Sequence, residues 1–408
     1  MRRGNVQRDA RAGHALATAM LMILALSAIV TALFTMTTAE YMRSREWRDE
    51  TRSFYVAEAG MNEAFAALVG AGPAGVAALA YPRTLGQGEY SVLMTLGEDD
   101  PAMLDNRVLL RSIGSEGRAT VGIEVIAWAV PNGDYLYAAF GDEGVLLNSN
   151  VTIDSFDSND GPYAGPMPAG ALANVGSNGD VELESNTEIW GDVIPGPSGV
   201  LIDSAPNSDV SGATSSAEDL VALDPITVPA IASTGPLTVG GATSLGPGAV
   251  HRSTVTVTSG GVLTIVGPAT VVIDDFELNA NSDLVIDSTG GPVEIFGTGD
   301  FELKSNSRVT TTGQQARDCA VYLSGDTGAT PPAVIDLSSN SDFTGTIYAP
   351  AADLVLASNF HLFGSLVGAS IELASNAQLH FDEDLLYEDG VLPEFEQLAW
   401  QVISKQEL

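Results

Sequence analysis

The stretch LVLASNFHL at residues 354–362 decides the fold, and IELASNAQL at residues 371–379 repeats it 17 positions later. In both copies Leu stands three residues before Asn, and another apolar residue stands three residues after it. The alternating apolar residues before the Asn predict a strand with one buried face, and the Asn predicts a turn onto a second strand. Each copy therefore predicts two strands that meet at a corner.

Seven copies of this pattern occur between residues 140 and 385, and six of them carry Ser immediately before the Asn. Successive copies lie 17, 19, 25, 34 and 36 residues apart, with one gap of 95. The corner residues are Asn150, Asn186, Asn281, Asn306, Asn340, Asn359 and Asn376. The preceding Leu residues are Leu147, Leu183, Leu278, Leu303, Leu337, Leu356 and Leu373.

Such copies predict a mainly β fold whose body is a parallel β-solenoid, or β-helix, with an asparagine ladder. Stacked coils would lie about 4.8 Å apart. The Asn side chains of successive coils would then hydrogen-bond to each other and to the turn backbone, so that no buried amide is left unpaired. A leucine-rich repeat is the nearest alternative, but it places its next apolar residue two positions after Asn rather than three.

This body is expected to span residues 136–385. A Pro-, Gly- and Ser-rich insertion at about 192–250 interrupts the spacing of the copies. The last segment, 386–408, carries Leu398, Trp400 and Val402 and is expected to cap the open end of the solenoid or to fold back on the preceding domain.

The charge of the chain is divided very unevenly. Residues 1–52 hold 8 of the 17 Lys and Arg against 5 acids, whereas residues 53–408 hold 9 bases against 47 acids, a net charge of −38. Such a field repels phosphates, so nucleic acid is not expected as a partner. With one cysteine, Cys319, the chain can form no internal disulfide and no cysteine-rich zinc site.

The N-terminal part predicts a membrane anchor. After a basic leader, residues 1–14, the 25 residues from Ala15 to Ala39 carry no charge. At about 1.5 Å per residue they can cross a hydrocarbon core of about 30 Å. The basic residues of the leader place the N-terminus in the cytoplasm and the body outside it. A secretory signal peptide is the alternative, although its apolar run is usually shorter.

The helical pattern continues beyond the membrane as an amphipathic helix, so that one helix is expected over residues 15–70. Three β-prone runs follow, at 89–96, 107–113 and 120–130, separated by turn signals. Residues 71–135 are therefore expected to form a small antiparallel meander on the outer half of the helix, as an α+β domain.

The leader ending in Gly13, the apolar helix and the stretch YVAEAG at 55–60 resemble PilX-type minor pilins. The resemblance implies cleavage between Gly13 and His14. It also implies a helix buried in the membrane or in a pilus core, and other pilus subunits and the assembly machinery as partners. Thr18 stands where most pilins have Glu. Several minor pilins also lack this Glu, which suits a priming or tip position. The later part of the body resembles solenoid domains found behind such N-termini.

The sequence predicts no catalytic centre and no resident cofactor. Asp274, Asp275 and Asp287, with Arg252 and Arg308, are the nearest approach to the carboxylate clusters of polysaccharide-active enzymes, and solvated acids are the simpler interpretation. The loop DSFDSNDG at 154–161 loosely resembles a calcium loop, which leaves a structural calcium ion open. The four His residues show no metal-ligand spacing, so no metal site is predicted.

Three hypotheses follow. The first is a non-catalytic structural or adhesive subunit of a type IV pilus or a related surface assembly, anchored in the cytoplasmic membrane by a single helix. The second is a membrane-tethered carbohydrate-active enzyme. The third is an adhesin that binds surface glycans without turnover.

Overall fold

The computed structural model describes residues 6–97, 107–133, 135–165, 172–203, 207–324, 335–387 and 393–403. Part of the predicted leader and the last five residues of the predicted cap lie outside this set. The chain forms two compact units. The first comprises Met1–Asp99, Asn106–Ala129 and Phe395–Leu408, and the second comprises Asp100–Asp105 and Val130–Glu394.

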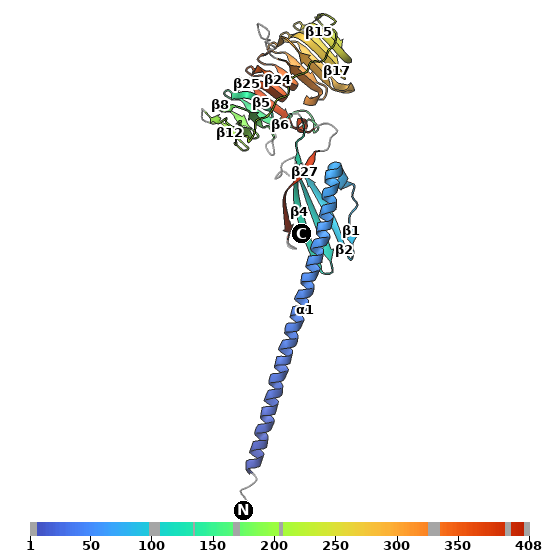
Figure 1. The fold of residues 1–408 in the computed structure, drawn as a ribbon, viewed down its shortest axis with the longest axis vertical. Helices are drawn as coiled ribbons and strands as arrows, with labels where there is room; N and C mark the ends of the chain where they lie inside the picture. Colours follow the sequence, from blue (N-terminus) through green and yellow to red (C-terminus); the bar gives the residue numbers. More distant parts are fainter. Residues whose placement is uncertain are drawn as a thin grey trace, which may run out of the picture. The chain divides into compact units, whose positions relative to one another are not determined.

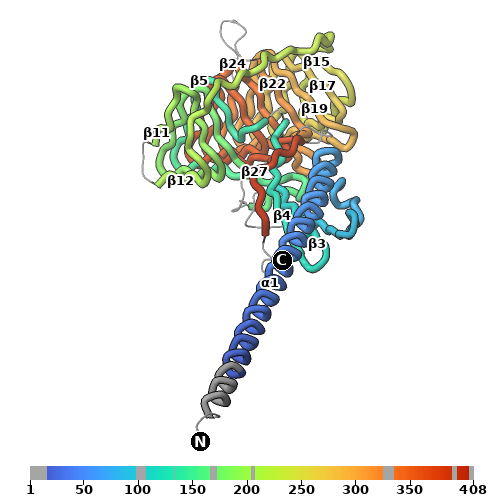
Figure 2. The backbone as a smooth tube through the Cα atoms, turned by 60° about the horizontal axis from the view of Figure 1, so that its bottom comes forward, coloured from blue at the N-terminus to red at the C-terminus, as the bar shows by residue number. Residues whose placement is uncertain are grey.

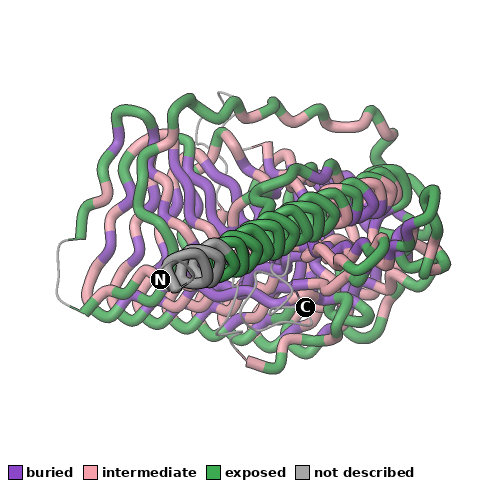
Figure 3. The backbone as a smooth tube through the Cα atoms, turned by 90° about the horizontal axis from the view of Figure 1, so that it is seen from below, coloured by how far each residue is buried: buried purple, intermediate pink, exposed green. Residues whose placement is uncertain are grey.

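The first unit is dominated by one helix, α1 (Val6–Ala77), which is interrupted by non-helical backbone at Ala71 and Gly72 just before Pro73. By length and composition α1 holds one segment that could cross a membrane, and no residue of its most apolar window is buried. Figure 3 shows the described N-terminal half of α1 as continuously exposed, with buried positions only farther along the chain. The apolar half of the helix thus has no covering partner among the residues that the structure describes.

The C-terminal half of α1 packs on a five-stranded sheet of order β1-β2-β3-β4-β27 (Figure 1). Its strands are β1 (Arg83–Leu85), β2 (Gly88–Leu96), β3 (Arg107–Glu116), β4 (Ala119–Val130) and β27 (Glu394–Ile403). The first four strands pair antiparallel in sequence order. The last segment of the chain thus lies beside β4 in this sheet.

Small residues bring α1 close to the sheet. Ser53, Ala57 and Ala64 are fully buried. A Cβ on Gly60 would lie 2.5 Å from a ring carbon of Tyr90, so only Gly fits at this contact. Ser112 Oγ donates to the Ala57 carbonyl at 2.7 Å. The stretch YVAEAG therefore forms a close helix–sheet contact.

The described residues of the second unit form parallel strands and three short 3₁₀ helices. The helices are η2 (Ser288–Gly290), η3 (Ala316–Asp318) and η4 (Glu383–Leu386). The strands are β5 (Ala139–Leu147), β6 (Thr152–Phe156), β7 (Val175–Ser177), β8 (Asp180–Leu183), β9 (Glu188–Ile189), β10 (Val193–Ile194), β11 (Leu201–Asp203), β12 (Asp209–Val210), β13 (Leu237–Val239), β14 (Ala242–Leu245), β15 (Gly248–Val257), β16 (Val262–Val266), β17 (Ala269–Leu278), β18 (Asp283–Asp287), β19 (Val293–Gly297), β20 (Phe301–Leu303), β21 (Arg308–Thr311), β22 (Cys319–Leu323), β23 (Ile335–Leu337), β24 (Asp342–Leu356), β25 (His361–Leu373) and β26 (Gln378–Asp382).

The spatial order of these strands departs from their sequence order. The chain enters at β5 and β6, and the strands β7 to β12 extend from there in one direction. An extended crossover, residues 211–236, then leads to β13. From β13 the strands return in order until β25 pairs with β5 and β26 pairs with β6 (Figure 2). The entry strands therefore lie in the interior of the sheet.

The predicted fold class is wrong in its central feature. The fold is mainly β with one long N-terminal helix, as expected, but the large sheet is not the predicted β-solenoid with an asparagine ladder. Its pairings close a parallel six-strand ring through β17, β19, β22, β24, β23 and β20, and the other strands extend from it. The ring closes because β17 and β24 are 10 and 15 residues long, and each pairs along its length with more than one neighbour.

The apolar residues of the seven sequence copies form the core of this unit. All seven Leu residues that precede the Asn are at most 1% exposed. Strand pairing stacks them, so that Leu278 lies opposite Leu303 and Leu303 opposite Leu337. Burial of one such side chain contributes about 1.5–3 kcal/mol, which makes this column a main source of the unit's stability.

Candidate functional site

A groove of about 520 Å³ crosses the parallel strands of the second unit. Its floor is a row of residues that strand register places opposite one another on five successive strands. The row consists of Ala249, Thr270, Glu294, Ala320 and Thr346. These residues alternate with core positions such as Ile295 and Val321, so their side chains leave the sheet on the outer face. The first and last floor residues are separated by four strand spacings, about 19 Å.

The floor is mostly small and polar. Thr270 Oγ1 donates to Glu294 Oε2 at 3.2 Å. Tyr322 also lines the groove, and its ring stacks on Phe296 with centroids 4.9 Å apart. Thr346 is 1% exposed, and its hydroxyl has no hydrogen-bond partner among the described residues. The accessible lining of the groove thus combines a hydroxyl, a carboxylate and an aromatic side chain.

Two short helices supply wall residues of the groove. Arg317 and Asp318 come from η3, and Leu385 comes from η4, next to Tyr387. The entry segment is fastened to η4, because the amides of Asn132 and Gly133 both donate to the carbonyl of Leu386, at 3.0 and 2.8 Å. Segments that are far apart in the sequence therefore meet at this wall.

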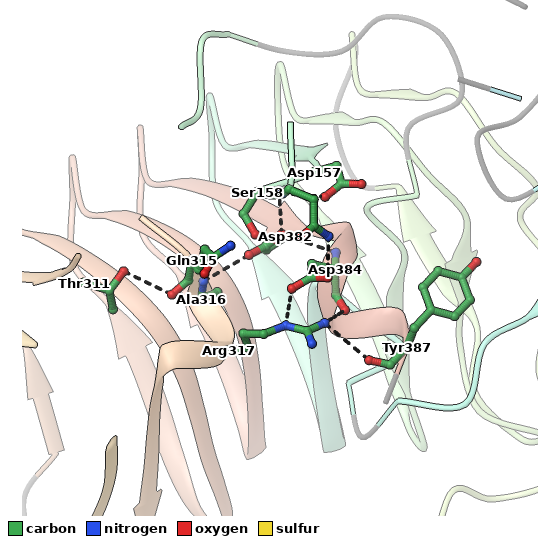
Figure 4. Close-up of polar contacts among 10 residues, drawn as sticks. Asp157, Ser158, Thr311, Gln315, Ala316, Arg317, Asp382, Asp384 and Tyr387 are labelled. Atoms are coloured by element: carbon green, nitrogen blue, oxygen red, sulfur yellow. Dashed lines mark hydrogen bonds and ion pairs between the residues drawn. The ribbon is translucent and has the colours of Figure 1, made fainter. Parts of the chain in front are cut away.

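A polar network holds η3 against η4, as Figure 4 shows. Arg317 forms an ion pair with Asp384 and donates to the carbonyls of Asp384 and Tyr387. Asp382 is fully buried and accepts backbone amides from Ser158 at 3.1 Å, from Ala316 at 3.0 Å and from Asp384 at 3.3 Å. One carboxylate thus ties three segments together and caps η4.

Burial shapes the electrostatics of this region. Desolvation raises the pKa of Asp318 above its ordinary value, while Ser288 and Arg317 oppose the shift. Desolvation also raises the pKa of Asp382, against the amides that stabilise its charged form. Burial thus shifts both carboxyl groups toward their neutral forms.

A second buried cluster lies beside this network. His380 Nδ1 is 2.5 Å from Asp154 Oδ1, and both side chains are at most 2% exposed. Tyr163 donates its hydroxyl to Asp154 Oδ2 at 2.6 Å, and its ring lies 4.0 Å from the His380 ring. Desolvation, followed by the bond to Asp154, raises the pKa of Tyr163. The His380 and Asp154 side chains are enclosed and Tyr163 is half-buried, which suits a structural contact rather than a reacting centre.

The seven predicted corner Asn residues all have left-handed backbone, with φ between 57° and 63°. Asn tolerates this conformation better than most residues because its short polar side chain bonds locally. Direct amide–amide bonds join some of them, as from Asn186 to Asn150 at 3.1 Å and from Asn359 to Asn340 at 3.3 Å. The sequence analysis did not include Asn207, which has φ 75° and donates to Asn186 at 3.4 Å.

The scattered acids that the sequence singled out do not converge. Asp274 pairs with His251 at 2.9 Å, Asp275 accepts the amide of Asp300 at 3.3 Å, and Asp287 accepts from Thr289. Arg308 pairs with Asp283, which lies opposite it on the neighbouring strand. Arg252 has a buried Nε with no hydrogen-bond partner among the described groups. No common site forms from this set.

The other features that the sequence singled out are the loop at 154–161, a possible metal site, the cysteine and the predicted cleavage residues. Within the loop at 154–161, Asp157 accepts the amide of Asn159 at 2.8 Å. Among the described residues no group of three His, Cys, Asp or Glu is arranged to hold a metal ion. Cys319 is fully buried, and desolvation raises its pKa to about 12, so the thiol is protonated at neutral pH. Gly13 and His14 lie within α1, in a part of the helix whose side chains are not described.

The sequence did not predict the groove, although a signal for it exists. Thr270, Glu294 and Ala320 each stand one residue before a core residue on their strands. Only the pairing register reveals that they form one row. The sequence also did not single out Asp382, whose carboxylate is buried.

Comparisons with known proteins give one family match. No curated protein matches the chain. Among solved structures, the chain is similar to the competence-associated pilin ComZ from Thermus thermophilus, at 14% identity and a TM-score of 0.23, over 87% of this chain and 98% of that one. It is also similar to an ice binding protein from an Antarctic bacterium of the Flavobacteriaceae, at 12% identity and a TM-score of 0.22, over 60% of this chain and 96% of that one.

The family match covers residues 185–388, half of the chain, and includes most of the groove and the network around Asp382. The chain therefore belongs to the family described as Domain of unknown function (DUF7305).

Proposed function

We propose that this chain is a non-catalytic structural or adhesive subunit of a type IV pilus or a related surface assembly. The single observation that carries the proposal is α1, whose apolar half is fully exposed and whose other half packs closely on the small sheet. Other pilus subunits and the assembly machinery are the partners in this proposal. The leader is cut between Gly13 and His14.

The exposed half of α1 needs an apolar environment. Side chains such as Leu21, Ile23 and Phe34 are at least 66% exposed. At about 25 cal/mol for each Å² of apolar surface, burying a segment of this length releases tens of kcal/mol. Either a bilayer or a bundle of like helices supplies that environment. The basic leader keeps the N-terminus in the cytoplasm and the two sheet units outside.

The buried or paired acids already form hydrogen bonds or ion pairs within the chain, which supports a non-catalytic role. Asp154, Asp274 and Asp382 each hold partners that fix other parts of the chain. The corner Asn residues fit the same interpretation, because they close turns and bond to neighbouring turns. In this proposal they are structural and bind no ligand.

A charge placed in the apolar segment tests the anchor. Leu26→Arg puts a cation near the middle of the span, at a cost of about 2.5–3.5 kcal/mol, whereas Tyr41→Arg places the same cation beyond its end. We expect the first variant to be lost from the membrane and from the sheared surface fraction, and the second to be retained. Equal retention of both variants would contradict the proposed anchor.

Loss of the gene product tests the assembly role. We expect the wild-type chain to co-purify with surface filaments, and deletion to reduce piliation or adhesion. An unaltered surface phenotype after deletion would count against the proposal. Release of reducing ends from a polysaccharide by the purified chain would instead favour the carbohydrate-active alternative.

A further inference from the structure

We infer that the groove across β15, β17, β19, β22 and β24 binds a neutral, hydroxyl-rich glycan chain in an extended form. The inference deepens the proposed function by giving the displayed unit a ligand class. It depends on that function only for the location of the unit outside the cell. The binding site itself rests on the groove.

The shape of the groove suits a linear polymer. Its floor crosses the strands at right angles and offers one accessible residue for each strand from Ala249 to Ala320, whereas Thr346 is covered at the end of the row. The spacing of the strands, about 4.8 Å, is close to the length of one sugar unit in an extended pyranose chain. Successive sugars can therefore meet equivalent positions on successive strands.

The chemistry of the lining suits sugar hydroxyls. Glu294 supplies acceptors, Thr270 a hydroxyl, and Arg317 and Asp318 a donor and an acceptor at the wall. Tyr322 adds an aromatic side chain to the lining, stacked on Phe296 and in edge contact with Tyr348. A few polar groups among apolar and aromatic side chains are typical of sites that orient a small, uncharged ligand.

The negative charge of the second unit disfavours anionic polymers as ligands. Residues 130–394 hold 4 Lys and Arg against 36 Asp and Glu, a net charge of −32, and Arg317, the one cation among the groove-lining residues, is already paired with Asp384. A polyanion such as nucleic acid or a uronic acid polymer would meet repulsion without compensation. A basic peptide would find only Glu294 and Asp318 as acidic partners in the groove.

Close packing and polar contacts hold the wall of the groove in place. Gly133 approaches η4 so closely that an added Cβ would lie 2.1 Å from the Leu385 carbonyl oxygen. Arg317 and Asp382 hold η3 and η4 from the other side. A preformed groove avoids the entropy cost of ordering a loop on binding.

Binding of the full-length chain in detergent to neutral hexasaccharides tests the inference. The probes are the hexamers of β-linked glucose, β-linked N-acetylglucosamine and α-linked glucose, with hexagalacturonate as the anionic control. We expect at least one neutral probe to bind and hexagalacturonate not to bind. Ala320→Leu, which fills the floor between Glu294 and Thr346, should weaken binding at least tenfold, and Tyr322→Ala should weaken it about fivefold.

The matched control is Thr264→Leu, an outward position on β16 that does not line the groove. It should leave affinity unchanged, and circular dichroism of all variants verifies folding. Absence of binding by every neutral probe, or equal affinity in the wild type and Ala320→Leu, would overturn the inference. Cleavage of a bound probe would also overturn it in favour of an enzyme. Because the assay uses the purified chain, it is independent of pilus assembly.

Discussion

Asn186 donates its side-chain amide to the side-chain carbonyl of Asn150 at 3.1 Å, although 36 residues separate them in the chain. Asn150 donates in the same way to Asn376 at 3.2 Å. All three residues have left-handed φ, between 58° and 63°. Each Asn therefore closes a turn through its backbone and joins the next turn through its side chain.

Substitution at Asn150 separates these two contributions. Asn150→Gly keeps the left-handed backbone and loses the side-chain bonds, so we expect a loss of about 1 kcal/mol. Asn150→Ala also adds a Cβ to a left-handed turn, so we expect a loss of about 2–3 kcal/mol. Urea unfolding of the full chain, read by pulse proteolysis, measures both. A smaller loss of unfolding free energy in Asn150→Ala than in Asn150→Gly would refute this assignment of the backbone and side-chain contributions.

Gly60 tests the contact between α1 and the small sheet. A Cβ there would meet Tyr90 at 2.5 Å and Ser112 Oγ at 2.6 Å, so we expect Gly60→Ala to destabilise the first unit by about 1–3 kcal/mol. Gly70→Ala is the control, because a Cβ at that position meets nothing within 4 Å. The control should be neutral or more stable by up to about 1 kcal/mol. The same unfolding assay measures both variants. Equal stability of Gly60→Ala and Gly70→Ala would contradict the close packing of α1 on the sheet.

Arg317 tests the clamp between η3 and η4. Arg317→Met removes the ion pair with Asp384, which is 12% exposed, and leaves this carboxylate without its cation. We expect a loss of about 2–3 kcal/mol and faster amide exchange over residues 383–387. Arg317→Lys keeps the charge but not the planar fork, so it should retain part of the protection. Wild-type exchange rates in the Met variant would show that the clamp is dispensable.

His251 makes the crossover pH-sensitive. Its Nδ1 lies 2.7 Å from the Ile231 carbonyl and its Nε2 lies 2.9 Å from Asp274, so only the doubly protonated ring donates to both. These two bonds raise its pKa above 6.5. The stabilisation is complete below pH 6.5 and is lost as pH rises through the raised pKa.

We therefore expect amide protection over residues 231–234 to fall between about pH 5.5 and about pH 8.5 in the wild type. His251→Gln should show little change over the same range. Protection factors from hydrogen exchange, corrected for intrinsic rates, measure this difference. A wild-type profile as flat as that of the Gln variant would contradict the proposed role of His251.

The sequence predicted the local features of this chain well. The Leu-x-x-Asn copies mark buried Leu and left-handed Asn because both depend only on neighbouring residues: Leu278 is fully buried and Asn281 has φ 57°. The long helix follows from an equally local pattern. The spatial order of the strands, by contrast, does not depend on neighbouring residues alone. Every copy presents similar edges, so nothing local specifies that β25 pairs with β5 rather than ending the sheet.

The groove was hidden from the sequence for the same reason. Arg317 and Asp384 lie 67 residues apart, and their contact depends on the pairing of β26 with β6 and on the placement of η3. Asp382 was not among the residues predicted for a site, although three backbone amides donate to its carboxylate. Burial of such a group depends on tertiary structure, which composition does not reveal.

The mature N-terminus of the chain extracted from its native membranes tests the central claim most directly. Mass spectrometry should find a chain that begins at His14, N-methylated as in pilins, and that retains the apolar segment up to Ala39. A chain that begins beyond Ala39 would show that this segment is a discarded signal. A chain that still begins at Met1 would place the protein outside the pilin pathway.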